Sequence, residues 1–176
     1  EEIFDELGEN ETGNEEDYHR EIVKLMILGR INELVGLLSK WTEKIRQDRA
    51  ERKESKLNGS LNGMLSLKQT ESEEEKAKLV EPNILRFFAH IVIALLQLKL
   101  ITEPEMNECC LSVIEAYTEY LVEYKLIQLV AHYSQFLPHE RQVKAFSSLL
   151  ATIDNEDDRQ LCIIVEKQAQ MNLPVL

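Results

Sequence analysis

The amino-acid sequence predicts an all-α protein, an irregular α-solenoid of about seven antiparallel helices. Apolar residues recur three or four positions apart along most of the chain, which is the spacing of one face of an α-helix. No segment shows the sustained alternation of apolar and polar residues that is typical of a half-buried strand. The breaks between helical segments are mostly very short, and short connections force consecutive helices to lie antiparallel, as they do in stacked helical repeats.

The sequence of residues 1–53 predicts an acidic N-terminal arm followed by a pair of helices. The arm, residues 1–17, contains nine Asp and Glu residues and no Lys or Arg. The first helix should span about residues 15–28, and Gly29 should end it because glycine adopts the left-handed conformation of a C-cap without strain. The second helix should follow at once and end near Lys53. The expected core positions of this pair are Tyr18, Ile22, Leu25, Met26, Ile31, Leu34, Val35, Leu38, Trp41 and Ile45.

Residues 54–81 differ in composition from the segments on either side. Ser, Asn, Gly, Lys and Glu dominate, and the helical spacing of apolar residues is lost. Such a composition buries too little apolar surface to offset the entropy of ordering the chain. We therefore expect residues 54–81 to be a disordered insertion. Pro82 should open the next helix, because the first turn of a helix tolerates its missing N–H group.

The sequence of residues 82–176 predicts a segment of helical repeats. Its first helix, to about Lys99, carries apolar residues on most of its circumference, so neighbours should cover it on more than one side. We expect this helix to be the most buried element, with Phe88 in the core. The next helix should begin at Thr102, because Thr102 and Glu105 have the spacing of a capping box.

Three shorter helices should follow, the last of them capped by Asp154 and Asn155. Their expected inner positions are Leu126, Leu129, Val130, Tyr133, Phe136, Val143, Phe146, Leu149, Leu150, Leu161, Cys162, Ile164, Val165 and Ala169. The chain begins at Glu1 without an initiator Met and ends in an apolar run. We interpret it as a fragment of a longer chain.

The formal net charge of −12 disfavours direct binding of nucleic acid, which depends on Lys and Arg that displace counterions from phosphates. Insertion in a membrane is also not expected. The most apolar window, residues 84–101, is interrupted by Arg86, His90, Gln97 and Lys99, so it predicts a buried helix. The sparse cysteines favour a reducing compartment.

The sequence predicts no catalytic, metal or cofactor site, and hence a protein that is not an enzyme. The four histidines, which lack the spacing of a metal motif, are His19, His90, His132 and His139. No nucleophile is paired with a base. Adjacent Cys109 and Cys110 are expected to pack as small apolar residues. Asp154–Asp158 resembles a calcium loop, but it lacks the required Gly and bidentate Glu, and helix capping accounts for it.

A run of basic residues near the end of the second helix has helical spacing: Lys44, Arg46, Arg49, Arg52, Lys53 and Lys56. Acidic residues interleave with it, which favours a solvated helix end over a patch for nucleic acid or nuclear import. The residues that bind a partner protein are not predicted by any of these patterns.

Several short segments, taken in order, resemble one known family. They are Glu2–Leu7, Tyr18-His19, Leu28–Ile31, Ser39–Trp41, Leu85–Phe87 with His90, and Tyr133 with Leu137-Pro138. Together they resemble the late middle of the nucleoporin 107 family, whose yeast counterpart is nucleoporin 84. The resemblance covers most of the chain except residues 54–80, which suggests a lineage-specific insertion there.

The resemblance implies a structural subunit of the Y-complex, a scaffold of the nuclear pore complex at the nuclear envelope, which supports mRNA export and protein import. It implies that residues 1–53 include the end of a helical trunk and that residues 82–176 begin a C-terminal tail domain. The implied partners are nucleoporin 133 on the C-terminal side and nucleoporin 96 on the N-terminal side. The helix pattern by itself also fits a vesicle-coat or cytosolic helical-repeat adaptor protein.

Overall fold

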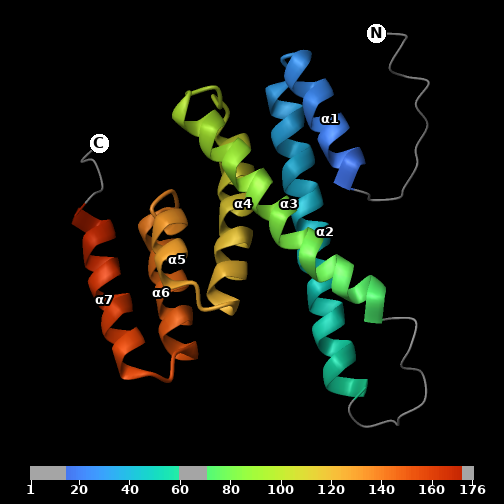
Figure 1. Ribbon diagram of the computed structural model, residues 1–176. Coiled ribbons are helices and arrows are strands. Elements are labelled where there is room, and N and C mark those ends of the chain that lie inside the picture. Colours follow the sequence, from blue (N-terminus) through green and yellow to red (C-terminus); the bar gives the residue numbers. More distant parts are fainter. Residues whose placement is uncertain (1–14, 60–70, 172–176) are drawn as a thin grey trace.

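The computed structural model describes residues 15–59 and 71–171, and within them it contains seven helices and no strand (Figure 1). The helices are α1 (Glu15–Ile27), α2 (Ile31–Gly59), α3 (Glu71–Gln97), α4 (Pro104–Glu123), α5 (Ile127–Ser134), α6 (His139–Thr152) and α7 (Glu156–Met171). The predicted all-α class is confirmed.

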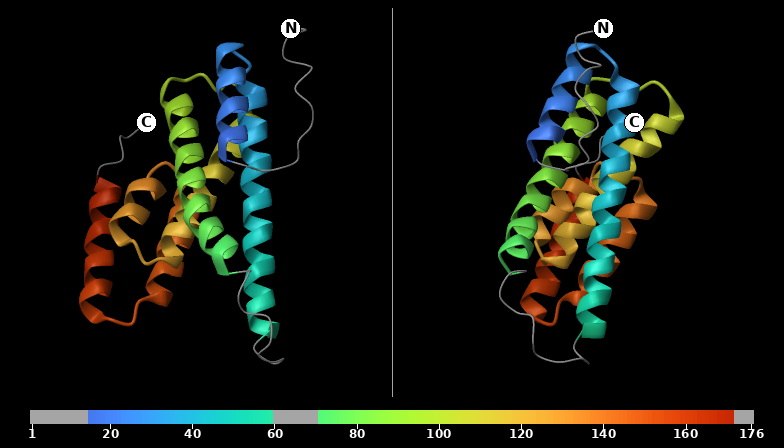
Figure 2. Two further views of the ribbon diagram at one scale, coloured as in Figure 1. Left: turned by 45° about the vertical axis from the view of Figure 1, so that its right-hand side comes forward. Right: turned by 90° about the vertical axis from the view of Figure 1, so that its right-hand side faces the viewer.

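The helices follow one another across the molecule from α1 and α2 at one side to α7 at the other (Figures 1 and 2). Each helix mainly contacts the next helix and the next but one. The helix α4 lies at the centre of this arrangement, because it contacts α2, α3, α5 and α6. Contacts between near neighbours in sequence are what a helical-repeat architecture requires.

Three helices end in the same kind of turn, in which one residue adopts a left-handed conformation. Gly29 has φ 67° after α1, Lys99 has φ 54° after α3, and Lys125 has φ 55° after α4. In each turn the next residue's N–H donates to the carbonyl oxygen five residues earlier, at an N···O distance of 3.0 Å. This pattern satisfies carbonyl groups that the helix end would leave without a partner. The predicted role of Gly29 is confirmed, whereas Lys occupies the two other positions.

An aromatic cluster joins the first three helices. Tyr18 of α1 lies edge-on to Trp41 of α2, with ring centroids 4.6 Å apart, and each ring lies 5.9 Å from Phe88 of α3. Phe88 is fully buried, as predicted. The helix α3 shares the core with α4, which contributes eight buried residues.

The structure differs from the prediction for residues 54–81. The helix α2 continues to Gly59 and α3 already begins at Glu71, so both sides of the predicted insertion are helical. Pro82 lies inside α3 and not in its first turn. The Glu, Lys, Ala and Leu residues before Pro82 are strong helix formers, and they outweigh the backbone hydrogen bond that proline removes. Residues 60–70, the acidic residues 1–14 and the C-terminal residues 172–176 lie outside the described part of the chain.

The start of α4 is near the predicted place, but its cap is different. Glu103 is the N-cap residue, it makes no side-chain capping bond, and Pro104 is the first helical residue. The Glu103 carboxylate instead accepts a hydrogen bond of 2.8 Å from Nδ2 of Asn32, near the start of α2. The predicted capping box with Thr102 as the cap is therefore wrong, because α4 begins one residue later, with Glu103 at the N-cap position.

The buried faces of α5 and α6 are shifted from their predicted positions. Leu126, Leu129 and Val143 are exposed, whereas Ile127 and Gln142 are buried. Met26 in α1 and Leu161 and Ile164 in α7, which were also expected at inner positions, are exposed as well. The amide of Gln142 donates a hydrogen bond of 2.7 Å to the carbonyl oxygen of Leu137, which satisfies it in the core. A polar side chain with a backbone partner can therefore take an inner position that apolar spacing would assign to a neighbour.

A candidate interaction groove between three helices

Three of the four histidines contact aromatic residues, and the fourth begins a helix. His19 stacks on Phe87 with ring centroids 4.6 Å apart, and His90 is 2.7 Å from the hydroxyl of Tyr133. His132 lies against the same Tyr133 ring, and His139 begins α6. In residues 15–59 and 71–171, no group of three or more His, Cys, Asp or Glu residues is arranged to hold a metal ion.

The cysteine and acidic segments also have structural explanations. Cys110 is buried in α4, and burial, followed by the neighbouring Cys109, raises its pKa to about 12. The thiol is protonated at neutral pH and therefore poorly nucleophilic. At the start of α7, Oδ1 of Asn155 accepts a hydrogen bond of 3.1 Å from the backbone N–H of Asp157. The predicted helix cap is confirmed there.

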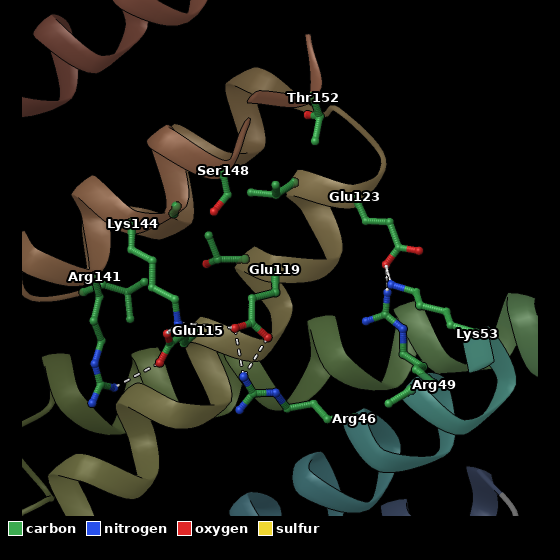
Figure 3. A pocket seen from close by; sticks show the side chains of 15 residues that line it. Arg46, Arg49, Lys53, Glu115, Glu119, Glu123, Arg141, Lys144, Ser148 and Thr152 are labelled. Atoms are coloured by element: carbon green, nitrogen blue, oxygen red, sulfur yellow. Dashed lines mark hydrogen bonds and ion pairs between the residues drawn. The ribbon is translucent and has the colours of Figure 1, made fainter. Parts of the chain in front are cut away.

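A groove of about 460 Å³ lies between α2, α4 and α6 (Figure 3). Each helix contributes charged residues at helical spacing, so that they share one face. The helix α4 presents Glu115, Glu119 and Glu123, α2 presents Arg46, Arg49 and Lys53, and α6 presents Arg141 and Lys144. A row of carboxylates on the central helix is thus flanked by a row of cations on each neighbour.

Ion pairs join α2 to α4 along one side of the groove. Nη2 of Arg46 donates to both carboxylate oxygens of Glu119, at 2.8 and 2.7 Å. Farther along, Glu123 accepts from Nη2 of Arg49 at 2.5 Å and from Nζ of Lys53 at 2.9 Å. The Arg49 guanidinium also lies over the ring of Tyr120, 5.0 Å from its centroid. This cation–π contact holds the guanidinium in position.

The other side of the groove joins α6 to α4 in the same way. Nζ of Lys144 donates to Oε1 of Glu115 at 2.8 Å, and Nη1 of Arg141 lies 3.4 Å from Oε2 of the same carboxylate. Arg141 also pairs with Glu108. The pKa values of Lys144 and Arg141 are raised, chiefly by the hydrogen bonds to Glu115 and Glu108 respectively. Both groups are therefore fully protonated at neutral pH.

The groove contains apolar and hydroxyl side chains as well as charges. Ala50, Val122, Leu137 and Ala145 line it together with Thr118, Ser148 and Thr152. The charged side chains are partly exposed, and exposed ion pairs contribute only about 0–1 kcal/mol each to stability. The arrangement offers no nucleophile with an adjacent base, but it offers donors, acceptors and apolar contacts to a polar ligand.

The groove was not predicted from the sequence. Arg46 and Arg49 were assigned to a solvated helix end, and they are instead half-buried in ion pairs with α4. The available signal was the spacing of Glu115, Glu119 and Glu123, four residues apart, beside the matching basic spacing on α2. Neither the acidic spacing on α4 nor the basic spacing on α2 indicates that these two helices are neighbours. Lys44 is exposed, as predicted for the whole run.

None of the described helices is long and apolar enough to cross a membrane. The fold and the groove define an all-α protein whose helices meet through salt-bridged and apolar surfaces. The family described as nuclear pore protein 84 / 107 matches residues 1–176, and the chain belongs to this family.

Curated relatives are nuclear-pore proteins from animals and yeast. The chain is 25% identical to the nuclear pore complex protein Nup107 of Mus musculus and 23% identical to that of Homo sapiens, over its full length. It is 29% identical to nucleoporin nup107 of Schizosaccharomyces pombe over 68% of the chain. The matched parts make up 16%, 16% and 14% of these three relatives. No solved structure gives a significant match.

The family membership confirms the predicted resemblance and identifies the chain as nucleoporin sequence of the nuclear pore complex, in the nuclear envelope. It favours this assignment over a vesicle-coat or cytosolic adaptor, which the helix pattern alone left open. The family is one of structural pore proteins and not of enzymes.

Proposed function

We propose that the chain is a structural segment of the Y-complex scaffold of the nuclear pore, which supports pore assembly, mRNA export and protein import. It acts through protein–protein contacts and catalyses no reaction. The observation that carries this proposal is exposed apolar surface at both ends of the helix series, because an internal part of a solenoid needs neighbours to cover such faces. Family membership supports the same assignment.

The first exposed surface lies on α1 and the turn that follows it. Val23, Met26, Ile27 and Leu28 are exposed, and Ile27 is the most exposed of them, at 80%. Leu98 and Leu100, in the turn between α3 and α4, are also exposed. The hydrogen bond between Asn32 and Glu103 shows that the starts of α2 and α4 lie close together, so these two turns are at the same end of the protein.

The second exposed surface lies on α7, where Leu161, Ile163 and Ile164 are exposed. The helix α7 is at the opposite side of the molecule from α1 (Figure 1). The relatives are several times longer than this chain. We propose that residues of the full-length protein or its partner cover α7, with nucleoporin 133 on this C-terminal side and nucleoporin 96 on the N-terminal side.

A pull-down tests this assignment. The chain should be tagged in two forms, as residues 1–176 and within the full-length protein, and each form should be incubated with purified nucleoporin 133. The full-length protein should retain nucleoporin 133, and residues 1–176 should retain it weakly. Failure of the full-length protein to bind any Y-complex nucleoporin, together with its absence from the nuclear rim, would contradict the proposal.

A further inference from the structure

We propose that the exposed apolar face of α1 is the docking site for residues 2–7 of the same chain, whose apolar side chains pack on it. The face consists of Val23, Met26 and Ile27. Residues 2–7 lie outside the described part of the chain. The inference does not rest on the proposed scaffold role, because the contact is within one chain. It leaves the apolar turn between α3 and α4 and the exposed face of α7 for neighbouring segments.

The apolar face of α1 is an uncovered stripe on an outer helix. Val23, Met26 and Ile27 have the i, i+3, i+4 spacing of one helix face, and their exposed fractions are 52%, 50% and 80%. Ile22 and Leu25 are buried on the other face, and α1 packs mainly on α2. The helix α1 lies at the outside of the helix series (Figure 1). Covering the stripe with apolar side chains is favourable, because it removes apolar surface from water.

Residues 2–7 carry a second apolar stripe. Ile3, Phe4 and Leu7 are spaced as i, i+1 and i+4, which is the spacing of one face of a helix. No apolar residue lies between Leu7 and Tyr18. These three side chains are therefore the only apolar groups that the sequence before α1 offers within residues 1–14.

The connection between the two stripes has a suitable length and composition. Residues 8–14 contain two Gly and two Asn, which are residue types that favour turns. Antiparallel helices are usually joined by about 2–8 residues, and this connection has seven. When extended it reaches about 25 Å, whereas α1, with 13 residues, is only about 20 Å long. The whole face is thus within reach, and the tether keeps the local concentration of the segment near the millimolar range.

The charges indicate where on α1 the segment lies. Residues 1–7 contain four acidic residues and no basic residue, and residues 15–17 in the first turn of α1 are also acidic. Arg20 is exposed, and Nζ of Lys24 lies 3.6 Å from Oε1 of Glu21, an exposed pair that exchanges partners readily. The acidic side chains of the segment are therefore best placed beside Arg20 and Lys24, next to the apolar face. The apolar contacts, and not the charges, should hold the segment there.

The direct test is the rate at which a maleimide reagent labels Val23→Cys within residues 1–176. A docked segment shields this thiol. A second protein that also carries Ile3→Ser, Phe4→Ser and Leu7→Ser should be labelled about tenfold faster, because the face is then open. The triple change keeps the net charge, and the unmodified chain gives the background from the native cysteines. Equal rates in the two proteins would overturn the proposal.

Lys40→Cys is the matched control, because it is an exposed position on α2, the helix on which α1 packs. The triple change at Ile3, Phe4 and Leu7 should alter the labelling rate of this thiol by less than about twofold, since no segment covers it. An equal increase at Lys40→Cys and Val23→Cys would show a general loosening of the fold and contradict the proposal.

The dependence on protein concentration distinguishes this segment from a second copy of the chain. Protection of Val23→Cys should stay constant over an about hundredfold range of concentration, because the segment is tethered to its site. Protection that rises with concentration would assign the face of α1 to a second copy and overturn the proposal.

Discussion

The two sides of α4 contact the rest of the protein through different chemistry. On one side Val113, Ile114 and Leu121 are buried in the core that α4 shares with its neighbours. On the other side Glu115 and Glu119 form partly exposed ion pairs with α2 and α6. Buried apolar contacts are costly to lose, whereas exposed ion pairs contribute little and exchange partners readily. The core side should therefore determine stability, whereas the ion pairs on the groove side should contribute little to it.

The largest expected effect is on the core side. Phe88→Asp should leave the chain unfolded, because it removes about 3–5 kcal/mol of aromatic burial and places an unpaired charge among apolar residues. A small domain has a total stability of only about 5–15 kcal/mol. Ala94→Asp, at an exposed position in the last turn of α3, is the matched control and should cost only about 1 kcal/mol, from lower helix propensity and an unfavourable charge at the helix C-terminus. Urea denaturation followed by circular dichroism measures the stability of both variants. Equal denaturation midpoints for the two variants would contradict the claim that the core side determines stability.

The groove side should show a much smaller effect on stability. A double-mutant cycle with Arg46→Met and Glu119→Gln should give a coupling energy of about 0.2–1 kcal/mol, because these side chains are 31% and 41% exposed. The coupling should fall when salt is raised from low to physiological concentration. Denaturant unfolding of the four proteins at both salt concentrations provides the measurement. A coupling of several kcal/mol that does not respond to salt would mean that the groove is part of the core.

Substitutions at two of the left-handed turns, Gly29 and Lys125, should change the stability in opposite directions. Gly29→Ala should destabilise by about 1 kcal/mol from backbone strain alone, because no atom lies within 4 Å of the added Cβ. Lys125→Gly should stabilise by about 0.5 kcal/mol, since relief of the left-handed strain exceeds the extra entropy cost of glycine. Thermal unfolding of the two variants tests this. The same sign for both would show that side-chain contacts of Lys125, and not its backbone, dominate.

The smallest expected effect concerns residues 60–70. Replacement of these residues by a Gly/Ser linker of equal length should change the free energy of unfolding by less than about 0.5 kcal/mol, because the linker keeps the number of residues that connect α2 to α3. A second replacement that spans residues 55–78 removes helical residues on both sides and should cost more. A loss of several kcal/mol from the shorter replacement would show that residues 60–70 pack against the helices.

Local signals predicted local structure well. Gly29 and Asn155 act through neighbouring backbone groups, so their roles as helix caps are evident from a few residues. Pro82 was misleading because its effect depends on whether the residues before it form a helix strong enough to include it. The predicted cap of α4 was wrong by one residue, because Glu103 and not Thr102 takes the N-cap position.

The candidate groove could not be predicted because it depends on which helices are neighbours. Glu119 and Arg46 are 73 residues apart, and each has the spacing of an ordinary solvated helix face. The exposure of Leu126 and the burial of Ile127 likewise depend on the packing of a short helix against α4 and α7. Periodicity identifies a helix and its apolar stripe, but tertiary contacts decide which edge of that stripe is covered.

The central claim is that the chain functions in the nuclear pore through surfaces that assembly covers. Its most direct test is nuclear-rim fluorescence of the tagged full-length protein with Ile163→Glu and Ile164→Glu on the exposed face of α7. Ser147→Glu with Ala151→Glu, at exposed positions of α6, is the matched control. We predict that the α7 variant loses its rim signal while the control and the unmodified protein keep theirs. A full-length protein that stays away from the rim, or an α7 variant that is retained there as strongly as the control, would contradict the account.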